Sequence, residues 1–188
     1  MNKKNLTERD ICTKFINPAI EKAGWNMRTQ VREEVSFTDG RIIVQGNLHT
    51  RGKRKRADYI LYIKPNVPIA IIEAKDNKHT VKSGIQQALG YANTLDIPCV
   101  FSSNGDGFYF HDKTISEGEI EREISLDEFP SPQELWEIYK KYKGIETPHQ
   151  EAIASQNYFH DTSGRSPRYY QQIAVNRTIE AVAKGQSR

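Results

Sequence analysis

Residues 56–75 constrain the fold of this chain more than any other stretch. Two runs rich in β-branched and aromatic residues, 56–63 and 69–75, flank segment 64–68, whose proline and asparagine composition is typical of a turn. We therefore expect an antiparallel hairpin. Its second run begins with consecutive apolar residues, which is typical of a central strand covered on both faces.

A turn centred between Pro65 and Asn66 sets the expected register of the hairpin. It pairs three residues with three others: Tyr62 with Ile69, Ile60 with Ile71 and Asp58 with Glu73. Opposed residues have Cβ atoms roughly 4.5–5.5 Å apart, where like charges repel unless a cation lies between them. Mg²⁺ takes one or two carboxylates and completes its shell with water or phosphate oxygens, so we expect Mg²⁺ at this pair.

The face that carries the two acids also carries Lys75, because side chains alternate along a strand. A lysine beside such a cation site can orient an attacking water or neutralise the charge that develops on a phosphate. The pattern therefore indicates metal-assisted phosphodiester hydrolysis. The alternative is a surface Glu-x-Lys ion pair without function, and a register slip of one residue would move Asp58 to the other face.

Composition places the chain among globular proteins with one α/β domain and an appendage. Of 188 residues, 37% are hydrophobic and 10% aromatic, which supports a packed core, while a net charge of +3 says little about a polyanionic partner. Cys12 and Cys99 have no paired spacing, which excludes a disulfide framework and fits a reducing cytoplasm. The scattered histidines argue against zinc, and no apolar run is long enough for a membrane.

Hydrophobic spacing predicts several helices and strands around the hairpin. The helices are expected over residues 8–22, with a perturbation at Pro18, over 81–95 and 132–143, and from 168 onward. The strands are expected within 25–37 and over 42–44, 99–102 and 108–111. Segment 117–128 is expected to be an acidic surface excursion, and 144–167 an irregular linker. This order predicts an α/β (α+β) fold with a central mixed sheet flanked by helices.

The strongest charge cluster of the chain, residues 51–56, directly precedes the hairpin. Phosphate neutralisation supplies most nonspecific DNA affinity, so we expect Lys53, Arg54, Lys55 and Arg56 to bind double-stranded DNA beside the cation site. A solvated loop is the alternative reading of this run.

Three elements in order, Asp58, Glu73-Ala74-Lys75 and Gln87-x-x-x-Tyr91, resemble the PD-(D/E)xK nuclease superfamily. More closely, segments 56–62, 69–75 and 86–92 look like the amino-terminal nuclease domain of type I restriction enzyme R (motor) subunits. Further similar segments extend the match along nearly the whole chain, at residues 6–11, 15–25, 103–105 and 130–136.

The resemblance implies a restriction-endonuclease-like core and assigns roles to these residues. Asp58 and Glu73 become ligands of Mg²⁺, for which Mn²⁺ can substitute, and Lys75 becomes the catalytic lysine. Gln87 and Tyr91 become accessory residues that support the site or contact DNA.

Two positions are less determined by the resemblance. An acid on the first helix often assists in this superfamily, and Glu8 or Glu21 can serve, with Glu8 the first candidate. Ala57 stands where the superfamily name has a proline, but that proline has no chemical role.

The resemblance also implies a division of the chain and a set of partners. Residues 1–143 form the endonuclease domain, 144–166 a linker and 167–188 the start of an ATPase motor, in which Gln171 resembles an adenine-recognising Q motif. No G-x-x-x-x-G-K-[ST] loop is present, so ATP is expected to act only in the full-length subunit.

By the same resemblance, the full subunit joins methyltransferase (M) and specificity (S) subunits in a cytoplasmic complex that cleaves unmodified foreign DNA. Two other functions stay open at this point. One is a repair-type nuclease with the same core, and the other is a noncatalytic DNA-binding or docking module whose acids are structural.

Overall fold

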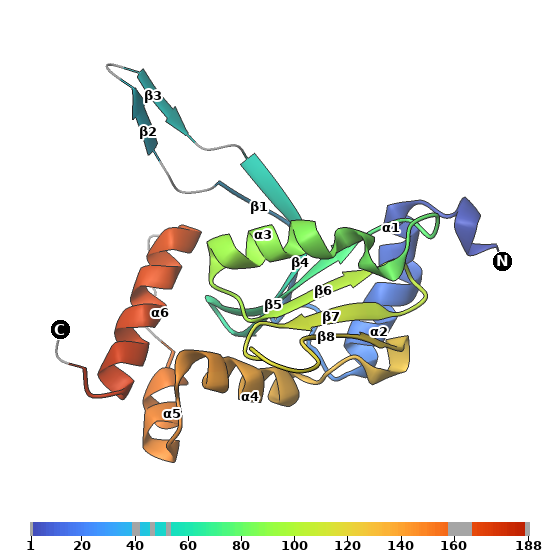
Figure 1. Cartoon of the computed structure of the whole chain (residues 1–188). Helices are drawn as coiled ribbons and strands as arrows, with labels where there is room; N and C mark the ends of the chain where they lie inside the picture. Colours follow the sequence, from blue (N-terminus) through green and yellow to red (C-terminus); the bar gives the residue numbers. More distant parts are fainter. Residues whose placement is uncertain (1, 39–41, 46–47, 52–53, 158–166, 187–188) are drawn as a thin grey trace.

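The computed structural model describes residues 2–38, 42–45, 48–51, 54–157 and 167–186, with the backbone alone described between 42 and 51. Its centre is a six-stranded mixed sheet in the order β1-β4-β5-β6-β7-β8 (Figure 1). The strands of this sheet are β1 Val31–Thr38, β4 Arg54–Lys64, β5 Val67–Ala74, β6 Cys99–Ser103, β7 Phe108–Asp112 and β8 Glu121–Ile124. A separate ribbon pairs β2 Ile42–Gln45 with β3 Leu48–Arg51.

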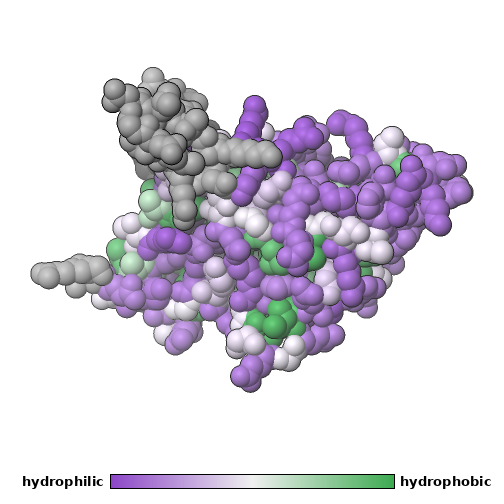
Figure 2. All heavy atoms as spheres, turned by 45° about the horizontal axis from the view of Figure 1, so that its top comes forward, coloured by the Kyte–Doolittle hydropathy of each residue, from purple (hydrophilic) through white to green (hydrophobic). Residues whose placement is uncertain are grey.

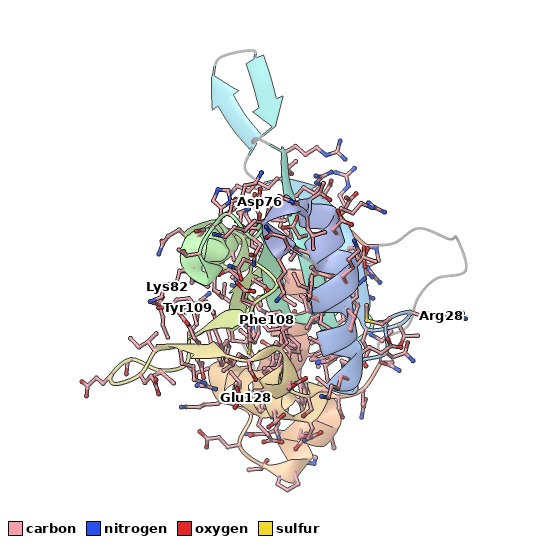
Figure 3. All side chains as sticks on the ribbon, turned by 90° about the vertical axis from the view of Figure 1, so that its right-hand side faces the viewer. Arg28, Asp76, Lys82, Phe108, Tyr109 and Glu128 are labelled. Carbon is pink, nitrogen blue, oxygen red and sulfur yellow. The ribbon has the colours of Figure 1, made fainter. Side chains whose placement is uncertain are left out.

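Helices cover both faces of the sheet, as the sequence predicts for an α/β fold. They are α1 Glu8–Ile11, α2 Asn17–Lys22, α3 Ile85–Leu95, α4 Pro132–Lys143, α5 Pro148–Ala154 and α6 Tyr169–Ala183. Helix α3 packs on one face, while α1, α2 and α4 share a core with the other face (Figure 3). None of the described helices combines the length and apolar character needed to cross a membrane.

The helix expected over residues 8–22 forms as one rod with a local irregularity. A π-helical turn, Cys12–Ile16, joins α1 to α2 immediately before Pro18. Proline has no N–H to donate to the carbonyl four residues earlier, which loosens the helical ladder at this point. The perturbation predicted at Pro18 is therefore confirmed.

Strand β5 is the central strand that its apolar sequence predicts. It pairs antiparallel with β4 and parallel with β6, and Ile69, Ala70, Ile71 and Ile72 are all fully buried. Ile71 belongs to the core under α3, whereas Ile72 belongs to the core under α1 and α2.

The hairpin forms with the predicted turn at Pro65 and Asn66, but its register holds only in part. Ile60 pairs with Ile71 as expected, whereas Tyr62 pairs with Pro68 rather than Ile69. A β-bulge beyond Leu61 shifts the pairing, and Pro68 has no N–H for a regular ladder. The shift affects the turn end of the hairpin. At the other end the ladder stops at Tyr59 with Ile72, one residue before the predicted pair of Asp58 with Glu73.

The first strand is confirmed but is shorter than the region expected for it, and two expectations for the connecting segments are wrong. The first strand begins at Val31, since residues 27–30 form a turn. Within the segment expected to be an acidic excursion, β8 pairs with β7 as an edge strand, where charged side chains are usual. The expected linker contains α5, which Thr147 caps and which Trp136 holds by donating Nε1–H to Glu151 at 2.7 Å.

Helix α6 packs through a stripe that is polar in its middle and has the apolar contacts of Tyr169 and Ala183 at its ends. Gln172, Asn176 and Glu180 are buried, whereas Val175 and Val182 are exposed. The Asn176 side chain donates to the carbonyl of Asn66 in the β4–β5 turn at 2.9 Å, and Glu180 accepts from the Tyr139 hydroxyl at 2.7 Å. Hydrogen bonds to the sheet and to α4 therefore position this helix.

Candidate active site

The carboxyl end of β5 lies between α1 and α3, and Figure 3 shows the following loop at Asp76 in this position. The loop that follows β5 is hydrogen-bonded to the loop between β6 and β7. Asn77 donates to the carbonyl of Asn104 at 3.0 Å, and Asn104 donates to the carbonyl of His79 at 2.8 Å. The segment directly after Lys75 is thus fixed to the core of the sheet.

At Asp58 the pairing of β4 with β5 ends, and its pairing with β1 is interrupted. The described pairs with β5 begin at Tyr59 with Ile72, and the Asp58 carboxylate accepts the Ala74 N–H at 2.8 Å. On the other side, Glu34 has a φ of 52° and no pair is formed between Glu34 and Asp58. The Asp58 carboxylate therefore takes the place of a backbone carbonyl as the acceptor for the Ala74 N–H, and this bond fixes the orientation of the side chain.

Glu73 is buried beside Asp58, with a side chain only 3% exposed. One carboxylate oxygen, Oε1, accepts from Lys75 Nζ at 3.1 Å and from the Gln87 amide. The other oxygen, Oε2, is buried and has no hydrogen-bond partner in the described part of the chain. Burial, followed by the charge of Asp58, raises the Glu73 pKa from 4.5 to about 7.

The two acids and the lysine influence one another as a group. Burial also raises the pKa of Asp58 above its ordinary value. Burial alone would lower the pKa of Lys75, but Glu73 and the other nearby carboxylates outweigh it and raise this pKa. Lys75 therefore stays protonated near neutral pH, which favours stabilisation of negative charge over proton abstraction.

Gln87 and Tyr91 meet at this site, as their spacing on one helix predicts. The Gln87 amide bridges from Glu73 to the Tyr91 hydroxyl, which it reaches at 3.1 Å. The Tyr91 ring packs edge-on against Phe37 at 5.3 Å between centroids, and Lys55 Nζ lies 5.8 Å from its centroid. Gln87 holds a carboxylate oxygen, and Tyr91 in turn supports Gln87.

Of the two acids on the first helix, Glu8 lies at the site. Burial and the charge of Asp58 raise the pKa of Glu8, whereas Lys75 lowers it. Glu21 lies 13 residues further along the same rod, which corresponds to roughly 20 Å of helix rise. Glu8 is therefore positioned to act with the group and Glu21 is not.

Gly84 is a site residue that the sequence reading missed. A Cβ on this glycine would lie 3.1 Å from Glu73 Cγ and 3.1 Å from Ser102 Cβ. The absence of a side chain thus lets the start of α3 approach the buried carboxylate. A glycine inside a predicted helix lowers the stability of the helix, so its presence was the indication in the sequence that Gly84 has a packing role.

Only part of the basic run falls within the described residues. Lys53 lies outside them, while Arg54 and Arg56 are exposed and Lys55 is half-buried on β4. Arg54 donates to the Ser36 hydroxyl at 3.2 Å, and Arg56 lies 3.8 Å from Glu34. These cations precede Asp58 on the same strand, which is the predicted placement beside the acids.

Gln171 lies apart from the carboxylates, at the start of α6. Its side-chain oxygen accepts the Arg168 N–H at 2.9 Å and so caps the helix. A role in binding a nucleotide stays a prediction.

The donor set of the site fits a hard divalent cation. Glu73 Oε2 is a buried oxygen without a hydrogen-bond partner among the described residues, and the charge of Asp58 raises the proton affinity of the Glu73 carboxylate. A cation at this position would give Oε2 a ligand and offset the repulsion between the two acids. Among the described residues, no group of three or more His, Cys, Asp or Glu is arranged to hold a metal ion. Mg²⁺ is compatible with only two acids, because it needs one or two carboxylates and takes its other ligands from water or phosphate oxygens.

Comparisons with known proteins give the family. A model of the family described as "Type I restriction enzyme R protein N terminus" matches residues 40–119, which include Asp58, Glu73, Lys75, Gln87 and Tyr91. The whole chain is also similar to the type I restriction enzyme EcoAI endonuclease subunit of Escherichia coli, with 52% identity over 189 residues. The chain belongs to the family of type I restriction enzyme R protein N-terminal domains.

A solved structure has the same fold. It is a fragment described as part of an HsdR subunit of a type I restriction enzyme from Vibrio vulnificus YJ016, with a TM-score of 0.77 and 35% identity over 96% of this chain. The chain spans 23% of the length of the Escherichia coli subunit and 33% of the Vibrio chain. The similarity therefore covers the amino-terminal region of much longer proteins.

Proposed function

We propose that the chain is the endonuclease domain of a type I restriction enzyme R subunit and hydrolyses DNA phosphodiester bonds with Mg²⁺. The observation that carries this proposal is the meeting of Asp58, Glu73 and Lys75 at the end of β5. Glu73 there offers a buried oxygen without a partner. The order and placement of these residues support membership of the PD-(D/E)xK superfamily.

In this proposal Asp58 and Glu73 hold the cation. Mg²⁺, or Mn²⁺ in its place, supplies a Lewis acid that polarises the phosphate and makes water more acidic. Asp58 is kept in direction by the Ala74 N–H, and Glu73 is kept in place by Gln87 and Lys75. The protein's contribution to cation binding is therefore a rigid pair of carboxylates.

Lys75 acts on the phosphate in the same proposal. Its ammonium stays charged near neutral pH because of the carboxylates around it. A fixed positive charge at this position neutralises the negative charge that increases on the phosphate as the P–O bond breaks. Glu8, which lies close enough to influence Asp58 and Lys75, positions this group or the attacking water.

The partners follow from the family and stay part of the proposal. Double-stranded DNA is the substrate, contacted by Arg54, Lys55 and Arg56. Lys53 completes the predicted set. Methyltransferase and specificity subunits direct the full-length subunit in a cytoplasmic complex, and ATP drives it through motor domains, with Gln171 the residue proposed to recognise the nucleotide.

Nicking of supercoiled plasmid by the chain tests the proposal. We expect Mg²⁺- or Mn²⁺-dependent nicking that falls by about 100-fold or more in Asp58→Asn, Glu73→Gln and Lys75→Met, since each removes charge from the reacting centre. Glu119→Gln, which removes an exposed carboxylate from the loop at the opposite end of the sheet, is the matched control. DNA binding without metal-dependent nicking would instead identify a docking module.

A further inference from the structure

Two arginines from different elements surround one carboxylate beside the candidate active site. Arg9 Nη1 of α1 lies 3.9 Å from one oxygen of Glu34, and Arg56 Nη1 of β4 lies 3.8 Å from the other. The side chains of Arg9, Arg56 and Glu34 are 85%, 61% and 58% exposed. Both distances exceed the length of a direct hydrogen bond, so the carboxylate holds neither guanidinium tightly.

The position of this cluster relates it to the reacting centre. Arg9 follows Glu8 in the chain, and Arg56 precedes Asp58 by two residues on β4. Arg56 is near enough for its charge to lower the pKa of Asp58. A group bound by both arginines would therefore lie next to the phosphate that the carboxylates and Lys75 are proposed to process.

The backbone of Glu34 is unusual in the same place. Its φ of 52° lies in the left-handed region, which a residue with a side chain rarely adopts within a strand. The pairing of β1 with β4 is interrupted here, between Glu33 with Tyr59 and Val35 with Ala57. Such irregularities change the direction of a side chain, and here the carboxylate reaches both arginines.

We propose that Arg9 and Arg56 form a clamp for a phosphate of the DNA backbone, and that Glu34 occupies the clamp until DNA replaces it. Guanidinium groups bind phosphate through paired N–H donors, which the two arginines offer from two directions. Exposed ion pairs at such distances contribute little, so the exchange is favourable. The inference rests on the proposed function, and of that function it requires that the chain binds DNA beside the carboxylates.

If Glu34 competes with phosphate for the two arginines, replacing Glu34 should increase the affinity of the chain for DNA. Glu34→Gln keeps the size of the side chain and removes the charge that competes with phosphate. Glu34→Gly removes the carboxylate and also suits the left-handed backbone, so it serves as a second variant. Arg9→Gln and Arg56→Gln remove the phosphate donors and should weaken binding.

The test is fluorescence anisotropy with a labelled DNA duplex in EDTA, where no cleavage takes place. We expect both Glu34 variants to bind roughly three- to tenfold tighter and each arginine variant to bind weaker by a similar factor, with a salt slope smaller by about one. In Arg9→Gln, the effect of Glu34→Gln should be reduced, since only the pair of Glu34 with Arg56 is left to break.

Matched charge changes elsewhere give the controls. Glu119→Gln removes one exposed negative charge, and Arg28→Gln removes one exposed positive charge far from the loop at Asp76 (Figure 3). Equal effects of Glu34→Gln and Glu119→Gln, or no DNA binding by the wild-type chain at low salt, would overturn the clamp.

The outcomes separate the clamp from the nuclease. Affinity that responds to Glu34 and Arg9, without metal-dependent nicking, upholds the clamp and refutes the proposed activity. Nicking that is lost in Glu73→Gln, with affinity unchanged in Glu34→Gln, upholds the activity and refutes the clamp.

Discussion

Replacing Glu73 by glutamine is expected to stabilise the folded chain at pH 8, although it removes an ion pair with Lys75. Burial next to Asp58 makes the charged form of Glu73 unfavourable in the folded state, so its pKa rises from 4.5 to about 7. Glutamine resembles the protonated acid in size and keeps an acceptor for the Lys75 ammonium. The variant therefore avoids the penalty of burying a charge.

The magnitude follows from the size of the pKa shift. Each pKa unit corresponds to about 1.4 kcal/mol, so a rise from 4.5 to about 7 corresponds to about 3.5 kcal/mol. The pKa of Glu73 is higher in the folded state than in the unfolded state. Its contribution to the stability of the fold is therefore fully present below pH 4.5. This contribution is lost as the pH rises through 7. Glu73→Gln should thus match the wild type near pH 4.5 and exceed its stability by about 3.5 kcal/mol at pH 8.

The assay is urea unfolding of both proteins in EDTA at pH 4.5, 6 and 8, followed by circular dichroism. The difference between the urea midpoints of the two proteins should grow with pH. At pH 8 it should correspond to a rise in melting temperature of roughly 7–14 °C. Glu119→Gln is the control for loss of an exposed carboxylate. A pH-independent difference, or a less stable variant at pH 8, would refute the burial argument.

Two further changes probe the surroundings of the site and the attachment of α6. Gly84→Ala places a Cβ 3.1 Å from Glu73 Cγ and Ser102 Cβ, so nicking should fall by about tenfold while stability changes by less than about 1 kcal/mol. Lys143→Met removes a cation that is 9% exposed and lies 2.7 Å from Asp96, so urea unfolding should show a loss of roughly 3 kcal/mol.

Each of these changes has a matched control on the same element or beside it. A Cβ at Gly90, on the same helix as Gln87, meets nothing within 4 Å, so Gly90→Ala should leave nicking unchanged and stabilise the chain slightly. Lys141→Met alters an exposed lysine of α4 and should be nearly neutral. Equal effects in test and control variants would contradict the contacts described.

Figure 2 shows one face of the molecule coloured by the hydropathy of its residues. The surface seen there is predominantly hydrophilic, and hydrophobic residues occur in scattered groups. The described part of this face therefore offers polar groups more than continuous apolar surface.

Local patterns were enough to predict the centre of the site. The two β-branched runs and the turn composition indicated the hairpin, and alternation placed Lys75 with Glu73, which it contacts at 3.1 Å. Helical spacing likewise brought Gln87 and Tyr91 together at 3.1 Å. These predictions succeeded because each depends on neighbours in the chain or on a single strand pairing.

Features that depend on distant contacts were not predictable in the same way. The packing of Gly84 against Glu73 joins two elements through the tertiary fold, and the bulge opposite Pro68 depends on how the hairpin meets its turn. The middle of the buried stripe of α6 is polar because Glu180 and Asn176 find partners on other elements. Hydrophobic periodicity does not report such partners.

Calorimetric titration of Mg²⁺ and Mn²⁺ into the chain tests the central claim most directly, because it requires neither DNA nor other subunits. The claim is that Asp58 and Glu73 form one cation site. The account predicts binding to the wild-type chain that is lost in both Asp58→Asn and Glu73→Gln, with Glu119→Gln unchanged. Identical binding in all four proteins would contradict it.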